Sequence, residues 1–210
     1  MTENQLRENI VALGRSMYER GLTHGSTGNI SARCSDGWLL TPTGSNLGQL
    51  DPARIAKLDW NGKLIAGDPP SKENFLHLAM YEERPQNGAV IHLHATHSVA
   101  VSVLADTNPE DALPPLTAYY VMRIGSLPMV PYYAPGDRAL AGAVRKLASR
   151  HHALLLANHG PVVAGSTLAA AADAIEELEA TARLHLLLRG EKTRPLDATQ
   201  VAELKRRYPL

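Results

Sequence analysis

Three histidines lie within six residues of the otherwise mostly apolar stretch VIHLHATHSV, residues 90–99. In a strand, alternate side chains point to the same face, so His92 and His94 would project together. Converging imidazole nitrogens are typical of zinc sites, and a catalytic zinc has three protein ligands, with nitrogen at about 2.0–2.1 Å. His97 has the opposite parity, so we expect it to begin the next helix and to stay outside the ligand set.

His159 is the best candidate for the third ligand. It lies in LANHGP, where an apolar strand meets a turn, and α/β sheets bind ligands at such strand ends. The alternative is a group of buried histidines that only form hydrogen bonds. An HxH pair together with a histidine at a strand end favours the metal site over that alternative. The histidines at positions 24, 77, 151, 152 and 185 have weaker claims.

Glu73 lies in SKEN, residues 71–74, which we predict to open a helix with Ser71 as its N-cap. The first turn of a helix offers free N–H groups and positive potential, and therefore holds anions. Three polar stretches could meet there, at residues 25–29, 41–45 and 71–72, with positive charge from Lys72. They predict a phosphate site. The alternative interpretation is that each polar stretch is an ordinary loop. Likewise, a glutamate such as Glu73 in the first turn of a helix is more often only a solvent-exposed acid.

The elements around these residues alternate between helix and strand. Apolar periodicity and turn residues predict helices, a hairpin that turns at Asn61-Gly62, and strands. The helices cover residues 3–20, 71–84, 98–105 and 166–189, the hairpin 55–67, and the strands 37–46, 88–95 and 152–160, with short strands and loops over 107–136. No regular βαβ rhythm or dinucleotide fingerprint appears. We expect one α/β domain, residues 1–210, with a helix-covered sheet of mixed or antiparallel pairing.

Composition limits the function further. The chain has 210 residues, with 21 basic and 21 acidic side chains, and this balance argues against a nucleic-acid partner. No apolar run approaches the roughly 20 residues that cross a membrane. The single cysteine, Cys34, excludes a disulfide framework, and the N-terminus does not resemble a signal peptide. We therefore expect a cytoplasmic protein that does not bind membranes.

Five motifs, in this order, resemble the class II aldolase/adducin family over nearly the whole chain: HGSTGNIS, LLTPTG, SKENFLHLAMYEERP, VIHLHATHSVAVS and LLLANHG. The resemblance implies a three-layer α/β/α fold with a central mixed, largely antiparallel sheet. It also implies a homotetramer with active sites between subunits. By position, His92, His94 and His159 match the zinc ligands, with one Zn²⁺, or another divalent metal, per subunit. Glu73 matches the catalytic acid/base.

The resemblance also implies residues that hold the substrate. The family's phosphate contacts match Gly28, Asn29, Thr43, Gly44 and Ser71, and Lys72 stands where fuculose-phosphate aldolases often have a second serine.

Three further residues are expected around the leaving part of the substrate. Tyr119 falls where family aldolases carry an active-site tyrosine. Arg123 could pair with a substrate carboxylate, or it could form a structural or intersubunit ion pair. Tyr208 matches a C-terminal tyrosine that reaches a neighbouring subunit's site, with a simple tail anchor as its alternative.

Residues 116–137 resemble most closely the 3-oxo-tetronate 4-phosphate decarboxylases of this family. A metal-dependent carboxy-lyase acting on a phosphorylated sugar acid is therefore implied. Loss of CO₂ would leave an enediolate, which zinc would stabilise. Protonation by Glu73 would then give dihydroxyacetone phosphate.

Other activities use the same groups. A retro-aldol cleavage reaches the same enediolate, so a sugar-phosphate aldolase of the fuculose-1-phosphate type is the first alternative. A pentulose-5-phosphate 4-epimerase is less favoured, because it should carry a further acid after the HxH motif, and Asp106 and Asp111 match that acid poorly. A non-catalytic adducin-like module should lack the three histidines and Glu73, all of which are present.

Overall fold

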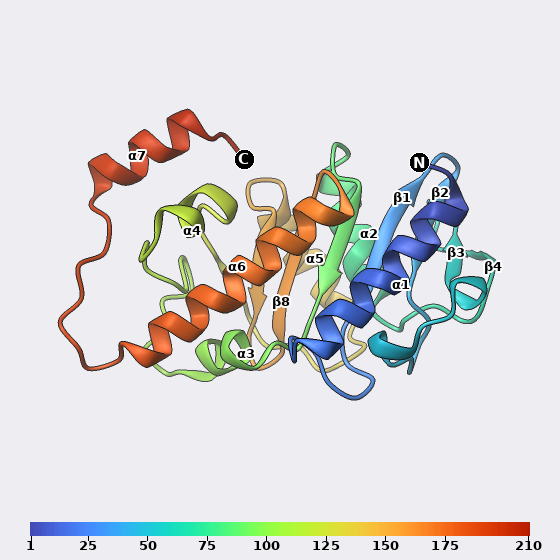
Figure 1. Ribbon diagram of the computed structural model, residues 1–210, viewed down its shortest axis with the longest axis horizontal. Coiled ribbons are helices and arrows are strands. Elements are labelled where there is room, and N and C mark those ends of the chain that lie inside the picture. Colours follow the sequence, from blue (N-terminus) through green and yellow to red (C-terminus); the bar gives the residue numbers. More distant parts are fainter.

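An eight-stranded sheet runs through the middle of the protein, and helices cover both of its faces (Figure 1). The computed structural model describes all 210 residues. The strands lie in the order β4-β3-β2-β1-β5-β8-β7-β6, and every neighbouring pair is antiparallel except β6 and β7. The predicted α/β fold with a mixed, largely antiparallel sheet is confirmed. The strands are β1 (Asn29–Cys34), β2 (Gly37–Leu40), β3 (Ala56–Leu58), β4 (Leu64–Ala66), β5 (Ala89–His92), β6 (Met129–Val130), β7 (Ala153–Leu156) and β8 (Gly160–Gly165).

Two helical layers bury two separate apolar cores against the sheet. The larger core lies under the helices at the front of Figure 1, and the smaller one lies behind the sheet. The front layer contains α1 (Glu3–Glu19), α3 (Thr96–Val103), α4 (Ala118–Arg123), α6 (Leu168–Leu187) and α7 (Ala198–Arg207). The rear layer contains α2 (Asn74–Glu83) and α5 (Ala139–Ala148), which pack against each other.

Strand β5 shows how the two layers share the sheet. Ile91 packs into the front core, whereas Val90 packs into the rear core. Because side chains alternate along a strand, His92 points to the same side as Val90, toward α2. The neighbouring strand β1 pairs Asn29 with His92, so the Asn29 side chain also faces α2. Strand parity therefore brings these polar groups to one face.

The start of α2 differs from the prediction. The helix begins at Asn74, not at Ser71, and Glu73 rather than Ser71 holds the N-cap position. The cause is a contact distant in sequence: the Ser71 N–H donates to the Thr41 carbonyl at 3.2 Å, and Pro70 pairs with Pro42. These contacts keep residues 70–71 extended beside residues 41–43, so the helix starts later.

Other elements match the prediction more closely, with exceptions. The hairpin forms between β3 and β4, and the first and last long helices lie where expected. His94, however, lies two residues beyond the end of β5, and residues 107–136 contain the unpredicted helix α4. Helices α5 and α7 and strands β1 and β8 were also not predicted.

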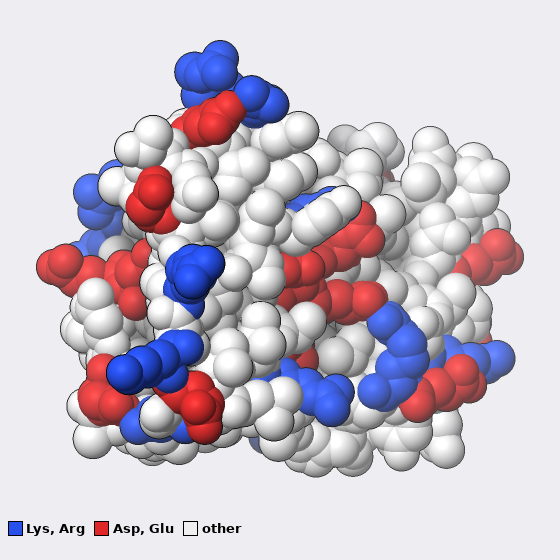
Figure 2. Space-filling model, turned by 60° about the vertical axis from the view of Figure 1, so that its left-hand side comes forward, with Lys and Arg blue, Asp and Glu red and all other residues white.

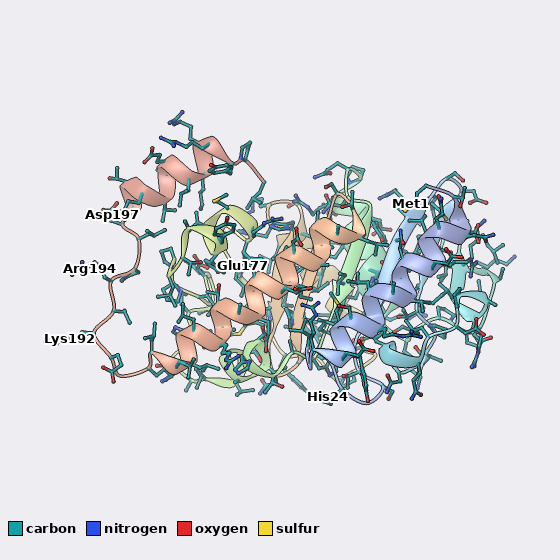
Figure 3. The ribbon with its side chains drawn as sticks, in the orientation of Figure 1. Met1, His24, Glu177, Lys192, Arg194 and Asp197 are labelled. Atoms are coloured by element: carbon teal, nitrogen blue, oxygen red, sulfur yellow. The ribbon has the colours of Figure 1, made fainter.

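The surface carries mixed charge. On the face shown in Figure 2, acidic and basic side chains are interspersed, and no large area is basic alone. None of the helices combines the length and the apolar character needed to cross a membrane. An extended segment, marked by Lys192, Arg194 and Asp197 in Figure 3, leads from α6 to α7.

Candidate active site

The three predicted histidine ligands and Glu73 lie together at one end of the sheet. Their nearest ligand atoms all lie within 4.8 Å of one another. The Nε2 atoms of His94 and His159 are 3.1 Å apart. The Glu73 carboxylate lies 3.2 Å from His159 Nε2 and 3.6 Å from His92 Nε2. Residues separated by up to 86 positions thus form one compact group of three nitrogens and a carboxylate.

His92 is held with one nitrogen free. It ends β5 and is fully buried, and its Nδ1–H donates to the Pro161 carbonyl at 2.8 Å. That bond assigns the proton to Nδ1 and leaves a lone pair on Nε2, which is buried without any hydrogen-bond partner. Unpartnered buried nitrogens are uncommon in proteins. A second nitrogen bonded to a carbonyl is the usual arrangement of a metal-binding imidazole.

The turn between β7 and β8 brings His159 to the other two histidines. Gly160 has φ +146° and allows the turn to pass very close to the β5 end, since a Cβ there would lie 2.3 Å from the Leu93 carbonyl oxygen. The Asn158 N–H donates to the Ser102 hydroxyl at 3.1 Å and ties the turn to α3. Both contacts position His159 against His94.

The protonation states favour cation binding. Burial, together with the nearby rings of His92 and His159, lowers the pKa of His94 to about 3, and burial also lowers the pKa of His92. A neutral imidazole keeps a lone pair on one ring nitrogen, and that lone pair can bind a cation. Burial alone would raise the pKa of Glu73, but the neighbouring His92 and His159 rings and the hydrogen bond from Asn29 outweigh burial and hold that pKa below its usual range. The donor set therefore suits a divalent metal.

Helix α3 follows directly after His94 and is secured by another helix. No side chain caps it at Ala95. Instead Glu179, buried on α6, accepts from the main chain and side chains of His97 and Ser98. As predicted, His97 lies in the first turn of this helix. The role of Glu179 was not predicted, because an acid within an amphipathic helix gives no local sign of its distant partner.

A cleft of about 750 Å³ opens beside the histidines. All three predicted polar stretches line it, so their expected convergence is observed. The predicted phosphate residues that line it are Gly28, Asn29, Thr43, Gly44, Ser71 and Lys72. Gly28 and Gly44 both have positive φ, which side-chain-bearing residues rarely adopt, and Lys72 has no acidic partner. The cleft therefore offers backbone N–H groups, hydroxyls and a positive charge to an anion.

Asn29 lines the cleft and also contacts Glu73. Its side-chain amide donates to Glu73 at 2.7 Å and to Ser71 at 3.2 Å. Both amide hydrogens are thus engaged within the protein. The side chain therefore holds the Glu73 carboxylate in place.

Several lining residues were not singled out from the sequence. Tyr132 and Tyr133 line the cleft from the loop after β6, and His24 lines it from the loop between α1 and β1. Figure 3 shows His24 at the lower edge of the molecule, the same edge as α3 in Figure 1. Nothing in the local sequence singled out Tyr132, Tyr133 or His24, because their approach to the cleft depends on loops that fold against distant segments.

Tyr119, Arg123 and Tyr208 do not lie in this cleft. They line a separate hollow of about 560 Å³ near the C-terminus. Arg123 pairs with Asp173 at 2.9 Å, and the Tyr119 side chain is 62% exposed. Within one chain these residues cannot contact a substrate held beside Glu73, since α4 and the C-terminal segment lie away from the histidine end of the sheet (Figure 1).

Comparisons with known proteins agree on one family. Residues 8–186 match the model described as the class II aldolase and adducin N-terminal domain. The 3-oxo-tetronate 4-phosphate decarboxylase of Pectobacterium atrosepticum is 50% identical over 204 residues, 97% of this chain and 94% of that protein. The enzyme of the same name from Haemophilus influenzae is 49% identical, covering 99% of both chains.

More distant relatives and solved structures extend this result. L-fuculose phosphate aldolase of Escherichia coli is 36% identical over 188 residues, 89% of this chain and 85% of that protein. The crystal structure of YgbL from Escherichia coli has a TM-score of 0.95 at 45% identity, covering 97% of this chain and 99% of that one.

Proposed function

Because the chain belongs to the class II aldolase and adducin family, we propose that it decarboxylates 3-oxo-tetronate 4-phosphate to dihydroxyacetone phosphate and CO₂. The relatives that carry this activity in their names are 49–50% identical over nearly the full chain. The observation that carries the proposal is the convergence of His92, His94, His159 and Glu73 beside a cleft with an anion-binding end.

His92, His94 and His159 would hold a divalent metal, for which we propose Zn²⁺, one per subunit. The buried unpartnered Nε2 of His92 and the neutral state of His94 support this assignment. When bound, such an ion supplies Lewis-acid stabilisation of negative charge on substrate oxygens. Nitrogen-rich donor sets favour zinc over magnesium or calcium.

The phosphate of the substrate would bind in the same cleft, against the glycine-containing loops. Thr43, Ser71 and Lys72 would provide two hydroxyls and a positive charge there, and the backbone N–H groups near Gly28 and Gly44 would add donors. A fixed phosphate limits where the other end of a short substrate can lie. The carbon chain would therefore extend toward Glu73 and the histidines, which is the positional advantage such sites exploit.

Glu73 would act as the acid/base that transfers a proton to C2. The bond between the carboxylate carbon C1 and C2 breaks, CO₂ leaves, and the electron pair stays on C2 beside the C3 ketone. Because Glu73 is ionised in the free protein, it must first accept a proton; in this proposal the C2 hydroxyl supplies it. Glu73 then delivers that proton to C2, and water returns one to the oxygen, so the reaction consumes one proton overall.

The separate hollow lined by Tyr119, Arg123 and Tyr208 bears on how subunits would be arranged. These residues reach a substrate only if a second copy of the chain places its hollow over the cleft. We therefore propose a homotetramer with active sites at the subunit interfaces, with Tyr119 acting in the neighbouring site. Arg123 and Tyr208 would contact substrate there. A cytoplasmic location accords with the single unpaired cysteine.

A product assay tests the function. Purified Zn²⁺-loaded protein is given 3-oxo-tetronate 4-phosphate and, separately, ketose 1-phosphates, and dihydroxyacetone phosphate, CO₂ and aldehydes are measured. CO₂ and dihydroxyacetone phosphate from the keto acid, with inert ketose phosphates, support the proposal. An aldehyde from a ketose 1-phosphate without CO₂ from the keto acid would make the protein an aldolase. A protein that binds no metal and turns over neither class would be a non-catalytic adducin-like module.

A further inference from the structure

A row of buried polar side chains lies behind Glu73, between α2 and β1. Glu73, His77 and Tyr81 follow one another at intervals of four along α2 and its N-cap, so they share one face of the helix. Asn29 and Ser31 alternate along β1 and project toward the same helix. His77 and Ser31 are completely buried, and Tyr81 is only 2% exposed.

Hydrogen bonds link the five side chains into one chain. Asn29 Nδ2 lies 2.7 Å from Glu73 Oε2, and Asn29 Oδ1 is hydrogen-bonded to His77 Nε2. His77 Nδ1 lies 2.7 Å from the Ser31 hydroxyl, which lies 2.8 Å from the Tyr81 hydroxyl. The row therefore leads from the edge of the cleft into the interior without a break.

The direction of every bond follows from the first one. A carboxylate only accepts, so Asn29 must direct its NH₂ group to Glu73 and its oxygen to His77. His77 must then carry its proton on Nε2, and its bare Nδ1 accepts from Ser31. The Ser31 hydroxyl could instead donate to the Val90 carbonyl, but that oxygen is more distant, at 3.4 Å. Because Ser31 donates to His77, its oxygen accepts from the Tyr81 hydroxyl.

The opposite orientation of the Asn29 amide is excluded by the same contacts. Turned by half a rotation, Asn29 would place its oxygen against the Glu73 carboxylate, with no proton between two acceptors. It would also lose the donor that His77 offers. The His77 ring is itself confined, because Trp38 lies parallel to it within 13°, with ring centres 6.5 Å apart. Full burial lowers the pKa of His77 to about 3, which keeps the ring neutral.

We propose that His77 is a positioning residue for Glu73. Supported by Ser31 and Tyr81, it fixes the Asn29 amide in the orientation that donates to the carboxylate, and so sets where Glu73 lies relative to the three histidines. This inference rests on the proposed acid/base role of Glu73. The sequence analysis gave His77 no role. In this inference His77 affects turnover rather than substrate or metal binding.

Two substitutions at His77 test the inference by activity. His77→Phe leaves Asn29 Oδ1 without a donor, and we expect kcat to fall about 10- to 100-fold, as for other outer hydrogen-bond partners, with less than about threefold change in KM. His77→Gln offers an amide N–H near the position of Nε2, and should recover most of the lost kcat. Both variants should bind as much metal as the wild type.

A matched control separates positioning from simple loss of a buried polar group. Thr181 on α6 is 1% exposed, and its hydroxyl bonds to Glu177 at 3.3 Å, away from the cleft. Thr181→Val should lower the melting temperature with kcat unchanged. Wild-type kcat in folded His77→Phe would overturn the inference, and so would a loss in His77→Phe that His77→Gln does not restore.

A spectroscopic measurement needs no variant. In the full-length metal-loaded protein labelled with ¹⁵N-histidine, His77 should give a neutral ring with its proton on Nε2 and none on Nδ1. A proton on Nδ1, alone or in addition, would contradict the bond directions and overturn the inference.

A companion variant separates this inference from the proposed function. If Glu73→Gln is inactive but His77→Phe is fully active, only the positioning role fails. If Glu73→Gln is itself as active as the wild type, the acid/base role fails first.

Discussion

The Glu179 carboxylate accepts from both the main-chain N–H and the hydroxyl of Ser98, at 2.9 and 2.6 Å. Its other oxygen accepts two bonds from His97 in the same way. A side chain on α6 thus caps α3, whose first residues follow His94 directly. Capping and burial together make this carboxylate important to both the fold and the ligand position.

Glu179→Gln should therefore weaken stability and metal binding together. An NH₂ group would replace one of the accepting oxygens and face two donors, and each unsatisfied buried group costs about 1–3 kcal/mol. We expect the free energy of unfolding to fall by roughly 2–4 kcal/mol and metal affinity to fall about tenfold, as measured by urea unfolding and metal titration. Glu176→Gln, on the same helix, removes only a partly exposed pair with Arg20 and should change stability by less than about 1 kcal/mol.

Glu73→Gln should abolish turnover without releasing metal. An amide cannot accept or deliver the proton, and acid–base groups typically contribute about 10²–10⁴-fold to the rate. Steady-state kinetics and metal analysis of the same preparation check this. Undiminished turnover would remove Glu73 from the mechanism.

His94→Ala should release the metal. Removing one of three nitrogen donors leaves an incomplete metal site. The wild type should lose metal and activity on treatment with a chelator, and it should regain both on addition of Zn²⁺. His185→Ala, at a histidine outside the cleft, should keep its metal. Full metal occupancy in purified His94→Ala would refute the ligand assignment.

The stability of the metal-free protein should fall as pH falls below neutrality. The pKa of His77 is about 3 in the folded protein and near 6.5 when unfolded, so the unfolded chain binds more protons between these values. Its contribution is complete above pH 6.5 and is lost toward pH 3. Between pH 7 and 5.5 we expect a loss of about 1 kcal/mol from this residue, measured by urea unfolding. His77→Gln should show a smaller loss over the same range; an equal loss would exclude His77 as its source.

Mixed oligomers test whether Tyr119 acts in a neighbouring subunit. Glu73→Gln and Tyr119→Phe subunits should each be nearly inactive alone. In a cyclic assembly, a random one-to-one mixture should place an intact Glu73 beside an intact Tyr119 in about a quarter of the sites. Recovery of about that share of wild-type activity supports a shared site, and no recovery in verified mixed oligomers contradicts it.

The features that could be predicted from the sequence are those determined over a few residues. The side of β5 to which His92 points, and the position of His159 just after β7, depend on local strand geometry, although His94 itself lies two residues beyond the end of β5. The mixed or antiparallel sheet was predicted from helices and strands that alternate without a regular βαβ rhythm. Local rules of this kind indicated the three histidines of the cluster that also contains Glu73.

The features that could not be predicted depend on contacts between distant segments. Ser71 lost its expected N-cap position because Thr41 holds its backbone. Asn29 donates to Glu73 because β1 pairs with β5 beside α2. Tyr119 lies far from the cleft because α4 packs against α6 and α7. In each case the residue type suggested the chemistry, but the tertiary arrangement decided the partner.

Gly160 has a practical consequence for altering this protein. Because even a methyl group at this position would collide with the Leu93 carbonyl, every substitution there must push the turn that carries His159 away from the end of β5. A library aimed at new substrates should therefore keep position 160 constant and vary the rim residues Tyr132 and Tyr133, which line the cleft without contributing to the histidine cluster. In a mutational scan, position 160 should tolerate no replacement, although no atom of its own takes part in the reaction.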